Sequence, residues 1–282
     1  MSGGTLVLGA SGRLGTMLRA FWPGRDAVWH GRVGTGGRVA FDLLTEPGKL
    51  ADAARGMNAI LCLSGVTPAA ALRSGAPMSL NAELALAAIR GAAETGKPRV
   101  LLASSAAVYG RARGLLDEEM PCEPVSEYGE AKLAMEDAGL ELGSELGIDV
   151  CCLRIGNVAG ADAILGGWRE GFALDRLDDG STPRRSYIGP RSLSLAIDAL
   201  TRARTLPARI NIAAPGAVAM GDLLDAAGLA WTPREAGPEV IPEVTLATAR
   251  LSQHIVLAAE SGLPDGLVAE FAAFRNLMQN PR

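Results

Sequence analysis

The sequence predicts an α/β fold with a doubly wound parallel sheet, and three observations support this. Short apolar runs recur along the chain, helical patterns separate them, and a glycine-rich loop follows the first run. Continuous apolar runs are typical of parallel strands that are buried on both faces. Strands that alternate with helices imply right-handed crossovers within one sheet.

The predicted strands are bounded by glycine, proline or charge, and they cover residues 5–9, 26–31, 58–64, 99–105, 149–154 and 209–214. Helical patterns cover residues 13–21, 47–55, 80–94, 128–146 and 192–204. The alternation weakens after residue 160, where residues 161–186 are rich in Gly, Asp and Arg with no clear strand. Residues from 216 onward show loops and short helices that end with a helix at 267–278.

These patterns predict two discontinuous domains. Residues 1–160 and 187–214 supply the sheet, and residues 161–186 and 215–282 supply a small second domain with the C-terminus. Residues 161–186 are interpreted as an excursion from the sheet and residues 209–214 as a return to it.

Composition excludes several classes of protein. A chain of 282 residues with 48% hydrophobic residues can bury a substantial core. A net charge of −4 and 4% aromatic residues give no basic stripe or stacking surface, so nucleic acid is not an expected partner. No uncharged apolar run reaches the ~18 residues of a membrane span, and no leader precedes "TLVLGA", so we expect a cytoplasmic protein without a membrane partner.

The four cysteines, at positions 62, 122, 151 and 152, lack CxxC spacing. Cys151 and Cys152 are adjacent in an apolar run, where a strand would point them to opposite faces. We expect buried free thiols in a reducing compartment and no metal site.

Gly9, Gly12 and Gly15 follow the first strand and open a helix in "TLVLGASGRLGTMLRAF". Here glycines permit a tight turn, close approach of a pyrophosphate to backbone N–H groups, and close packing of helix on strand. The GxxGxxG spacing is one residue wider at its start than the common dinucleotide fingerprint. A turn that serves packing alone is the alternative, and the strand before and helix after favour dinucleotide binding.

The end of the second strand bears on which dinucleotide binds. The run "VWHGR" places Gly31 where an acidic residue would accept hydrogen bonds from the ribose, and Arg32 follows. Arg32 would attract a 2′-phosphate, with Arg13 and Arg38 in support, so we expect NADP, with NAD as the alternative. Asp42 is then expected to face the adenine amino group. Both Arg32 and Asp42 also fit ordinary surface residues.

In "YGEAK", Tyr128 stands one helical turn before Lys132, one of 3 lysines in the chain. Residues four apart share a helix face, so both side chains reach one site. An ammonium ~4 Å away at an effective dielectric of ~20 favours a phenolate by about 4 kcal/mol, so Lys132 is expected to lower the pKa of Tyr128. An amphipathic surface helix is the alternative, with a chance match on the order of one in a hundred.

Ser104 and Ser105 end the fourth predicted strand, at the edge of the sheet where ligands bind in open α/β folds. A serine at this edge can hydrogen bond a substrate carbonyl or hydroxyl. Alternatively, these two hydroxyls only cap the end of a loop. The nearby "YGEAK" favours a role in substrate binding and catalysis.

The glycine loop, "SSAAVYG", "YGEAK", "LRIGNVAG" and "RRSYIG" occur in this order over about two thirds of the chain. Together they resemble the extended short-chain dehydrogenase/reductase family, in its NAD-dependent epimerase/dehydratase branch. The resemblance implies a Rossmann domain, a small C-terminal substrate domain and hydride transfer at nicotinamide C4. It also allows a homodimer through a four-helix interface.

The resemblance implies roles for individual residues. Ser105 would orient the reacting oxygen, Tyr128 would exchange its proton, and Lys132 would hold the nicotinamide ribose. The pyrophosphate would lie against Gly9, Ser11, Gly12, Arg13, Leu14 and Gly15, the adenosine against Arg32, Asp42 and Leu43, and the nicotinamide against Leu63, Ser64 and Gly65. Asn157 and Arg185 match positions that often contact substrate.

Two departures from the family pattern affect function. Sugar 4,6-dehydratases follow the active-site hydroxyl with Asp-Glu, whereas Ala106 and Ala107 stand here, which disfavours dehydration by that route. After Arg185 the usual acidic, aromatic and His-Val-acidic-acidic residues are replaced by "SYIGPRS". With a short C-terminal region, this change suggests a smaller anion, such as a sugar acid or sugar phosphate, in place of a nucleotide sugar.

Arg185 itself has two readings. It would present a cation to substrate beside Tyr187, or it would be a surface arginine paired with Asp178 or Asp179.

Three functions remain open from the sequence. The first is an NAD(P)-dependent oxidoreductase acting on a hydroxyl/ketone pair of a sugar-like or other polar metabolite. The second is an NAD(P)-dependent epimerase of a sugar or nucleotide sugar, and the third is a silent dinucleotide-binding regulator.

Overall fold

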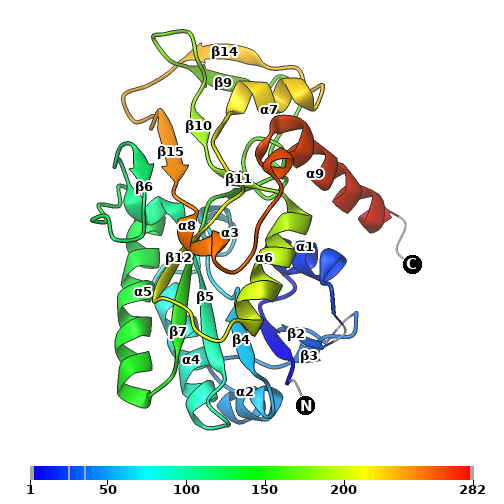
Figure 1. Ribbon diagram of the computed structural model, residues 1–282, viewed down its shortest axis with the longest axis vertical. Coiled ribbons are helices and arrows are strands. Elements are labelled where there is room, and N and C mark those ends of the chain that lie inside the picture. Colours follow the sequence, from blue (N-terminus) through cyan, green and yellow to red (C-terminus); the bar gives the residue numbers. More distant parts are fainter. Residues whose placement is uncertain (1–2, 25, 35, 280–282) are drawn as a thin grey trace.

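A computed structural model of the chain describes residues 3–24, 26–34 and 36–279. In this described part, seven strands form a parallel sheet in the order β12-β7-β5-β4-β1-β2-β3 (Figure 1). Their bounds are β1 Thr5–Leu8, β2 Ala27–Gly31, β3 Val39–Ala40, β4 Ala59–Cys62, β5 Arg99–Ser105, β7 Val150–Ile155 and β12 Arg209–Ile212. The order reverses at β1, which pairs with β2 on one side and β4 on the other. The sheet is therefore a Rossmann fold, whose ligands bind at the reversal.

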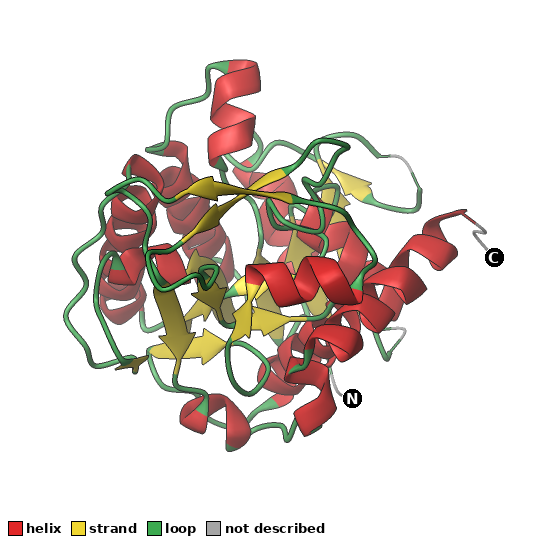
Figure 2. Cartoon of the chain, turned by 90° about the horizontal axis from the view of Figure 1, so that it is seen from above, coloured by secondary structure: helices red, strands yellow, loops and turns green. Residues whose placement is uncertain are grey.

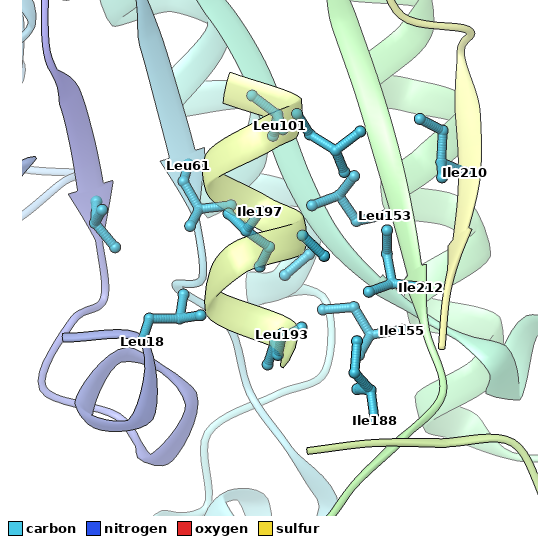
Figure 3. Close-up of a cluster of buried hydrophobic side chains, with 14 of the residues drawn as sticks. Leu18, Leu61, Leu101, Leu153, Ile155, Ile188, Leu193, Ile197, Ile210 and Ile212 are labelled. Carbon is cyan, nitrogen blue, oxygen red and sulfur yellow. The ribbon is translucent and has the colours of Figure 1, made fainter. Parts of the chain in front are cut away.

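Helices cover both faces of the sheet (Figure 2). One face carries α1 Arg13–Phe21 and α6 Pro190–Arg202, and the other carries α2 Pro47–Ala54, α4 Leu80–Ala93 and α5 Glu127–Leu146. Successive residues of β1 alternate between the faces, with Val7 in one core and Leu6 in the other. Figure 3 shows Leu61, Leu101 and Leu153, from neighbouring strands, facing α6.

The helix α5 is defined by its two ends. Ser126 accepts a hydrogen bond from the backbone N–H of Gly129 at 3.1 Å, and Gly147 ends the helix with φ +64°. The predicted helix at 128–146 is confirmed to within one residue. The helix α6 begins at Pro190, two residues before the prediction, because proline fits the first helical position.

The prediction that residues 161–186 contain no strand is wrong. Strands β9 Ala173–Arg176 and β10 Arg184–Arg185 occur there, outside the main sheet, and three more strands follow residue 216. Sequence patterns missed them because they are only two to four residues long, and β14 is fully exposed. The remaining elements are α3 Pro68–Ser74, η1 Ala106–Tyr109, β6 Leu115–Leu116, β8 Asn157–Val158, β11 Tyr187–Ile188, β13 Val218–Ala219, α7 Met220–Ala226, β14 Thr232–Glu235, β15 Glu243–Leu246, α8 Ala249–Ser252, η2 Ala259–Gly262 and α9 Pro264–Gln279.

Small sheets link these short strands. The strand β10, which contains Arg185, pairs with β13 and β15, and β15 pairs with β6. One small sheet therefore joins β10 to an earlier strand and to two later strands of the chain. The strand β11 pairs with β8 at the end of β7. This pairing brings Arg185 towards the carboxyl edge of the main sheet.

All four cysteines are free thiols, three of them buried and Cys122 half-buried. Cys151 and Cys152 lie in the cores on opposite faces of the sheet, as predicted from their adjacency. Among the residues that the structure describes, none of the helices has the length and apolar character needed to span a bilayer.

Candidate functional site

The glycine loop lies between β1 and α1, at the reversal of the sheet. Gly9 has φ +77°, and a Cβ there would come 2.7 Å from the backbone nitrogen of Ser64 at the end of β4. A Cβ at Gly15 would come 2.6 Å from the carbonyl oxygen of Ala10. Both positions therefore require glycine, one for backbone conformation and close strand approach, the other for packing of α1 on the loop.

The middle of this loop faces outward. Ser11, Gly12 and Arg13 are exposed, and Gly12 begins the helix without any side chain to cap it. The helix therefore presents backbone N–H groups at its positive end, the arrangement that binds phosphate in dinucleotide folds. Arg13 also donates to the carbonyl oxygen of Ala161 at 3.0 Å, which links the loop to the excursion segment.

His30, at the end of β2, is a site residue that the sequence analysis missed. Its side chain is 1% exposed, its Nδ1 lies 3.3 Å from the backbone nitrogen of Gly9, and its Nε2 lies 2.8 Å from the carbonyl oxygen of Phe41. Burial lowers the pKa of His30. A lone histidine in an apolar strand gives no periodic signal, so only the contacts reveal its position.

Arg32 and Arg38, expected to meet a 2′-phosphate, lie at and after the end of β2. Arg32 is exposed, and a Cβ at Gly31 would come 3.2 Å from Nε of Arg38. The space that an acidic side chain would enter is thus occupied by Arg38. Asp42 does not extend freely from this region, because its Oδ1 accepts from the backbone nitrogens of Leu44 and Thr45 at 2.9 and 3.0 Å. These bonds, foremost that from Thr45, lower the pKa of Asp42.

Leu63, Ser64 and Gly65 follow β4, and Gly65 lies beside α4 and α5. A Cβ at Gly65 would come 2.5 Å from Oδ1 of Asn81 and 3.4 Å from Nζ of Lys132. Asn81 is fully buried and bonds both backbone groups of Val66, at 3.2 and 3.1 Å. The sequence analysis missed Asn81, which holds this segment against α4.

Ser105, Tyr128 and Lys132 meet at the carboxyl edge of the sheet. Ser105 is the last residue of β5, and its Oγ accepts from the backbone N–H of Ala107 at 3.2 Å. Its hydroxyl lies close enough to Tyr128, in the first turn of α5, to act on the pKa of that side chain. Lys132 is 6% exposed, donates to the carbonyl oxygen of Ala103 at 2.8 Å, and has its Nζ 5.8 Å from the centroid of the Tyr128 ring. Burial lowers the pKa of Lys132 to about 8.

The pKa of Tyr128 is not lowered, contrary to the prediction. Burial raises it, and the hydrogen bond from Ser105 opposes that rise without reversing it. Lys132 donates to the carbonyl oxygen of Ala103 in β5, with its Nζ 5.8 Å from the centroid of the Tyr128 ring. Tyr128 therefore remains protonated at neutral pH, which suits a proton donor.

A buried ionic network centred on Glu136 lies next to Lys132 in α5 and Ser104 in β5. Glu136, fully buried one turn after Lys132, accepts from Oγ of Ser104 at 2.6 Å and from Nη2 of Arg154 at 2.8 Å. Nε of Arg209 lies 3.0 Å from the same carboxylate. A buried carboxylate with donors from three residues holds β5, α5, β7 and β12 in one arrangement.

A cavity of about 280 Å³ opens beside Ser105. Ser105, Ser126, Asn157 and Arg185 supply its polar groups. The rest of its wall is apolar or glycine: Ala106, Ala107, Gly110, Val125, Ile155, Gly156, Ile241 and Val244. The expected substrate residues Asn157 and Arg185 thus share one cavity with the Ser105 hydroxyl.

Arg185 lies half-buried in the wall of this cavity. Its Nη1 donates to the carbonyl oxygen of Arg184 at 2.7 Å, and burial lowers its pKa. Asp179, offered as a surface partner, instead accepts from Ser181 at 2.6 Å. Among the residues that the structure describes, the ion pairs of Asp175 with Arg234 and of Arg202 with Asp198 do not involve Arg185, whose role stays a prediction.

Tyr187 does not join Arg185 in the cavity wall, so that expectation is wrong. Its side chain is 1% exposed in the apolar core of the second region, and its hydroxyl lies 3.3 Å from Oδ2 of Asp162. The strands β10 and β11 belong to different sheets, which separates the surroundings of Arg185 and Tyr187.

Solved structures of similar fold cover nearly the whole chain. One is MoeE5 in complex with UDP-glucuronic acid and NAD, with 23% identity, TM-score 0.77, and 97% of this chain and 99% of that chain covered. Another is UDP-glucose 4-epimerase from Brucella ovis in complex with NAD, with 17% identity, TM-score 0.79, and coverage of 95% and 97%. A third is DesIV, a dTDP-glucose 4,6-dehydratase from Streptomyces venezuelae with NAD and TYD bound. It has 19% identity and a TM-score of 0.74, and the match covers 98% of this chain and 97% of that chain.

The coverage corrects one expectation, because the C-terminal region is not short beside these enzymes. No curated protein sequence matches the chain. The sequence profile of the NAD dependent epimerase/dehydratase family matches residues 5–169, more than half of the chain. The chain therefore belongs to the NAD-dependent epimerase/dehydratase family.

Proposed function

We propose that the protein is an NADP(H)-dependent oxidoreductase that interconverts a ketone and a hydroxyl on a sugar-like, negatively charged metabolite. One observation carries the proposal: Ser105, Tyr128 and buried Lys132 lie together at the carboxyl edge of a Rossmann sheet, and Ser105 shares a cavity with Arg185. Family membership and a dinucleotide cofactor agree with it.

The proposed chemistry needs one proton and one hydride at the substrate carbonyl. The dinucleotide supplies the hydride when it is bound. Tyr128 donates its phenolic proton to the carbonyl oxygen, because its raised pKa keeps the hydroxyl protonated. Ser105 orients that oxygen through its own hydroxyl, Lys132 would hold the nicotinamide ribose, and Tyr128 then recovers its proton from solvent.

The proposed preference for NADP rests on the end of β2. Arg38 occupies the space over Gly31 where an acidic side chain would otherwise stand, and Arg32 is exposed next to it. A 2′-phosphate at this position would meet cations, whereas a ribose hydroxyl would lack its usual carboxylate partner. The solved structures named above contain NAD, so this preference would set the chain apart from them.

The proposed substrate carries an anionic group that Arg185 binds. A guanidinium that is half-buried in a cavity wall is suited to a carboxylate or a phosphate. A cavity of about 280 Å³ is just below the ~300–1,000 Å³ of small-molecule sites, which favours a sugar acid or sugar phosphate over a larger ligand. A nucleotide sugar is the second candidate, since MoeE5 binds UDP-glucuronic acid in a chain of nearly the same length.

Two other functions compete with reduction. An epimerase would use the same Tyr128 and Lys132 to oxidise and re-reduce one carbon, and one similar structure is a UDP-glucose 4-epimerase. A silent regulator would bind dinucleotide without chemistry. Dehydration is disfavoured because Ala106 and Ala107 stand in the cavity wall where acid and base groups would be needed.

The test uses purified protein with NADPH, NADH or their oxidised forms and three substrate sets: sugar acids, sugar phosphates and UDP-sugars. Loss of absorbance at 340 nm that depends on added NADPH supports the reductase. A new sugar epimer without net cofactor consumption supports the epimerase. Tight NADPH binding without turnover on any set would overturn the enzymatic proposal.

A matched pair of variants links any turnover to this site. Tyr128→Phe and Tyr187→Phe each remove one phenolic hydroxyl, from a half-buried and a buried side chain respectively, but only the first lies beside Ser105. Loss of turnover in the first variant alone supports the assignment.

A further inference from the structure

The imidazole of His30 connects the two loops between which a dinucleotide would lie. The backbone N–H of Gly9 belongs to the glycine loop, and the carbonyl oxygen of Phe41 lies directly before Asp42. The ring of His30 also stacks on the ring of Phe41, with centroids 4.1 Å apart and planes 34° apart. The carbonyl oxygen of His30 accepts from the backbone N–H of Ala10 at 2.8 Å. Two segments that are 32 residues apart in the chain are thus tied to one side chain.

The two contacts fix the tautomer of the ring. The carbonyl oxygen of Phe41 can only accept, so Nε2 of His30 carries the hydrogen. The backbone N–H of Gly9 can only donate, so Nδ1 is the acceptor. A neutral imidazole satisfies both contacts at once.

We propose that His30 is a positioning residue for the dinucleotide, which sets the spacing between the glycine loop and the segment at Phe41 and Asp42. The proposal rests on the dinucleotide function proposed above. A ligand that spans both segments needs them at a fixed separation, and His30 is the side chain that joins them. A ligand that touches only one segment does not need that separation.

Three substitutions separate the contributions of the two hydrogen bonds. His30→Phe keeps the ring and its packing but loses both bonds. His30→Asn retains an acceptor near the Nδ1 position, and His30→Gln retains a donor near the Nε2 position. His254→Phe is the matched control, because it replaces the chain's other histidine, which is half-buried after α8.

The experiment measures dissociation constants by calorimetry for NADPH, NADH and ADP-ribose, and for adenosine by NMR titration, after circular dichroism has verified folding. We expect His30→Phe to weaken the three spanning ligands roughly 10- to 30-fold, and His30→Asn and His30→Gln to weaken them about 3- to 10-fold each, with adenosine changed less than 2-fold. His254→Phe should match the wild type. His30→Asn and His30→Gln keep the test valid if His30→Phe does not fold.

Two results would overturn the proposal. Wild-type affinity for ADP-ribose in all three variants would show that the spacing does not depend on His30. An equal loss for adenosine and ADP-ribose would show that His30 only shapes the adenosine side. If the wild type binds none of the three spanning ligands, both the proposed dinucleotide function and the proposed role of His30 are refuted.

Discussion

Lys132 should make the cofactor-free protein more stable as the pH rises from 8 to 10.5. Its pKa is lowered by burial from 10.5 to about 8 in the folded state. Between these values the unfolded chain binds the proton and the folded chain does not, so the free energy of unfolding increases with pH. Below pH 8 both states are protonated, and the full penalty for burying the charge remains.

The size of this effect follows from the shift. A fall from 10.5 to about 8 corresponds to roughly 3 kcal/mol at neutral pH. Lys132→Met removes that penalty but also removes the hydrogen bond to Ala103, worth about 1 kcal/mol. We expect the variant to be about 2 kcal/mol more stable than the wild type at pH 7 and about 1 kcal/mol less stable above pH 10.5.

The assay is urea unfolding followed by far-ultraviolet circular dichroism between pH 7 and 11. Groups common to both proteins cancel in the difference, so the crossing of the two stability curves reports Lys132 alone. Lys49→Met, which removes an exposed lysine from α2, should follow the wild type throughout. A difference between Lys132→Met and wild type that stays constant over this range would refute the reasoning.

Three further predictions concern ligands. Arg32→Ala should weaken NADPH binding roughly 10- to 100-fold with little effect on NADH, because one charge-assisted hydrogen bond to the 2′-phosphate is lost; equal losses for both cofactors in calorimetry would contradict this role. Tyr128→Phe should keep the fold and cofactor affinity but lower turnover about 10²–10⁴-fold, and near wild-type rates would remove Tyr128 from the mechanism. Arg185→Met should raise the substrate KM ~10-fold or more with NADPH affinity unchanged, whereas an unchanged KM would assign Arg185 to structure alone.

The central sheet and its glycine loop were predictable from the sequence because their signals are local. Apolar runs such as "NAILCLS" and helical patterns such as 13–21 need no knowledge of distant residues. Gly9 and Gly15 are likewise set by the turn that directly follows β1. The same reasoning placed Tyr128 and Lys132 on one helix and Ser105 at the neighbouring strand end.

The features that could not be predicted depend on partners far apart in the chain. In the sequence, Glu136 is one of many acidic residues. Its partners Arg154 and Arg209 lie 18 and 73 residues away along the chain, so only the folded structure shows that it is the centre of a network. The pKa of Tyr128 depends on how deeply the fold buries it and on where Lys132 turns. The direction of Tyr187 depends on a change of sheet between β10 and β11 that no two-residue pattern reveals. The division into two domains stays a prediction.

The strand β12 pairs with β7 in the main sheet although it comes from residues 209–212, and this limits where the protein can be truncated. The family profile ends at residue 169, but the core on one face of the sheet also contains Leu193 and Ile197 from α6 and Leu251 from beyond β12. A fragment of residues 1–169 would expose that apolar face and leave the buried carboxylate of Glu136 without Arg209. Such a fragment should aggregate on expression. Fusions, deletions and reporter insertions are therefore better placed in exposed loops of the 282-residue chain than at residue 169.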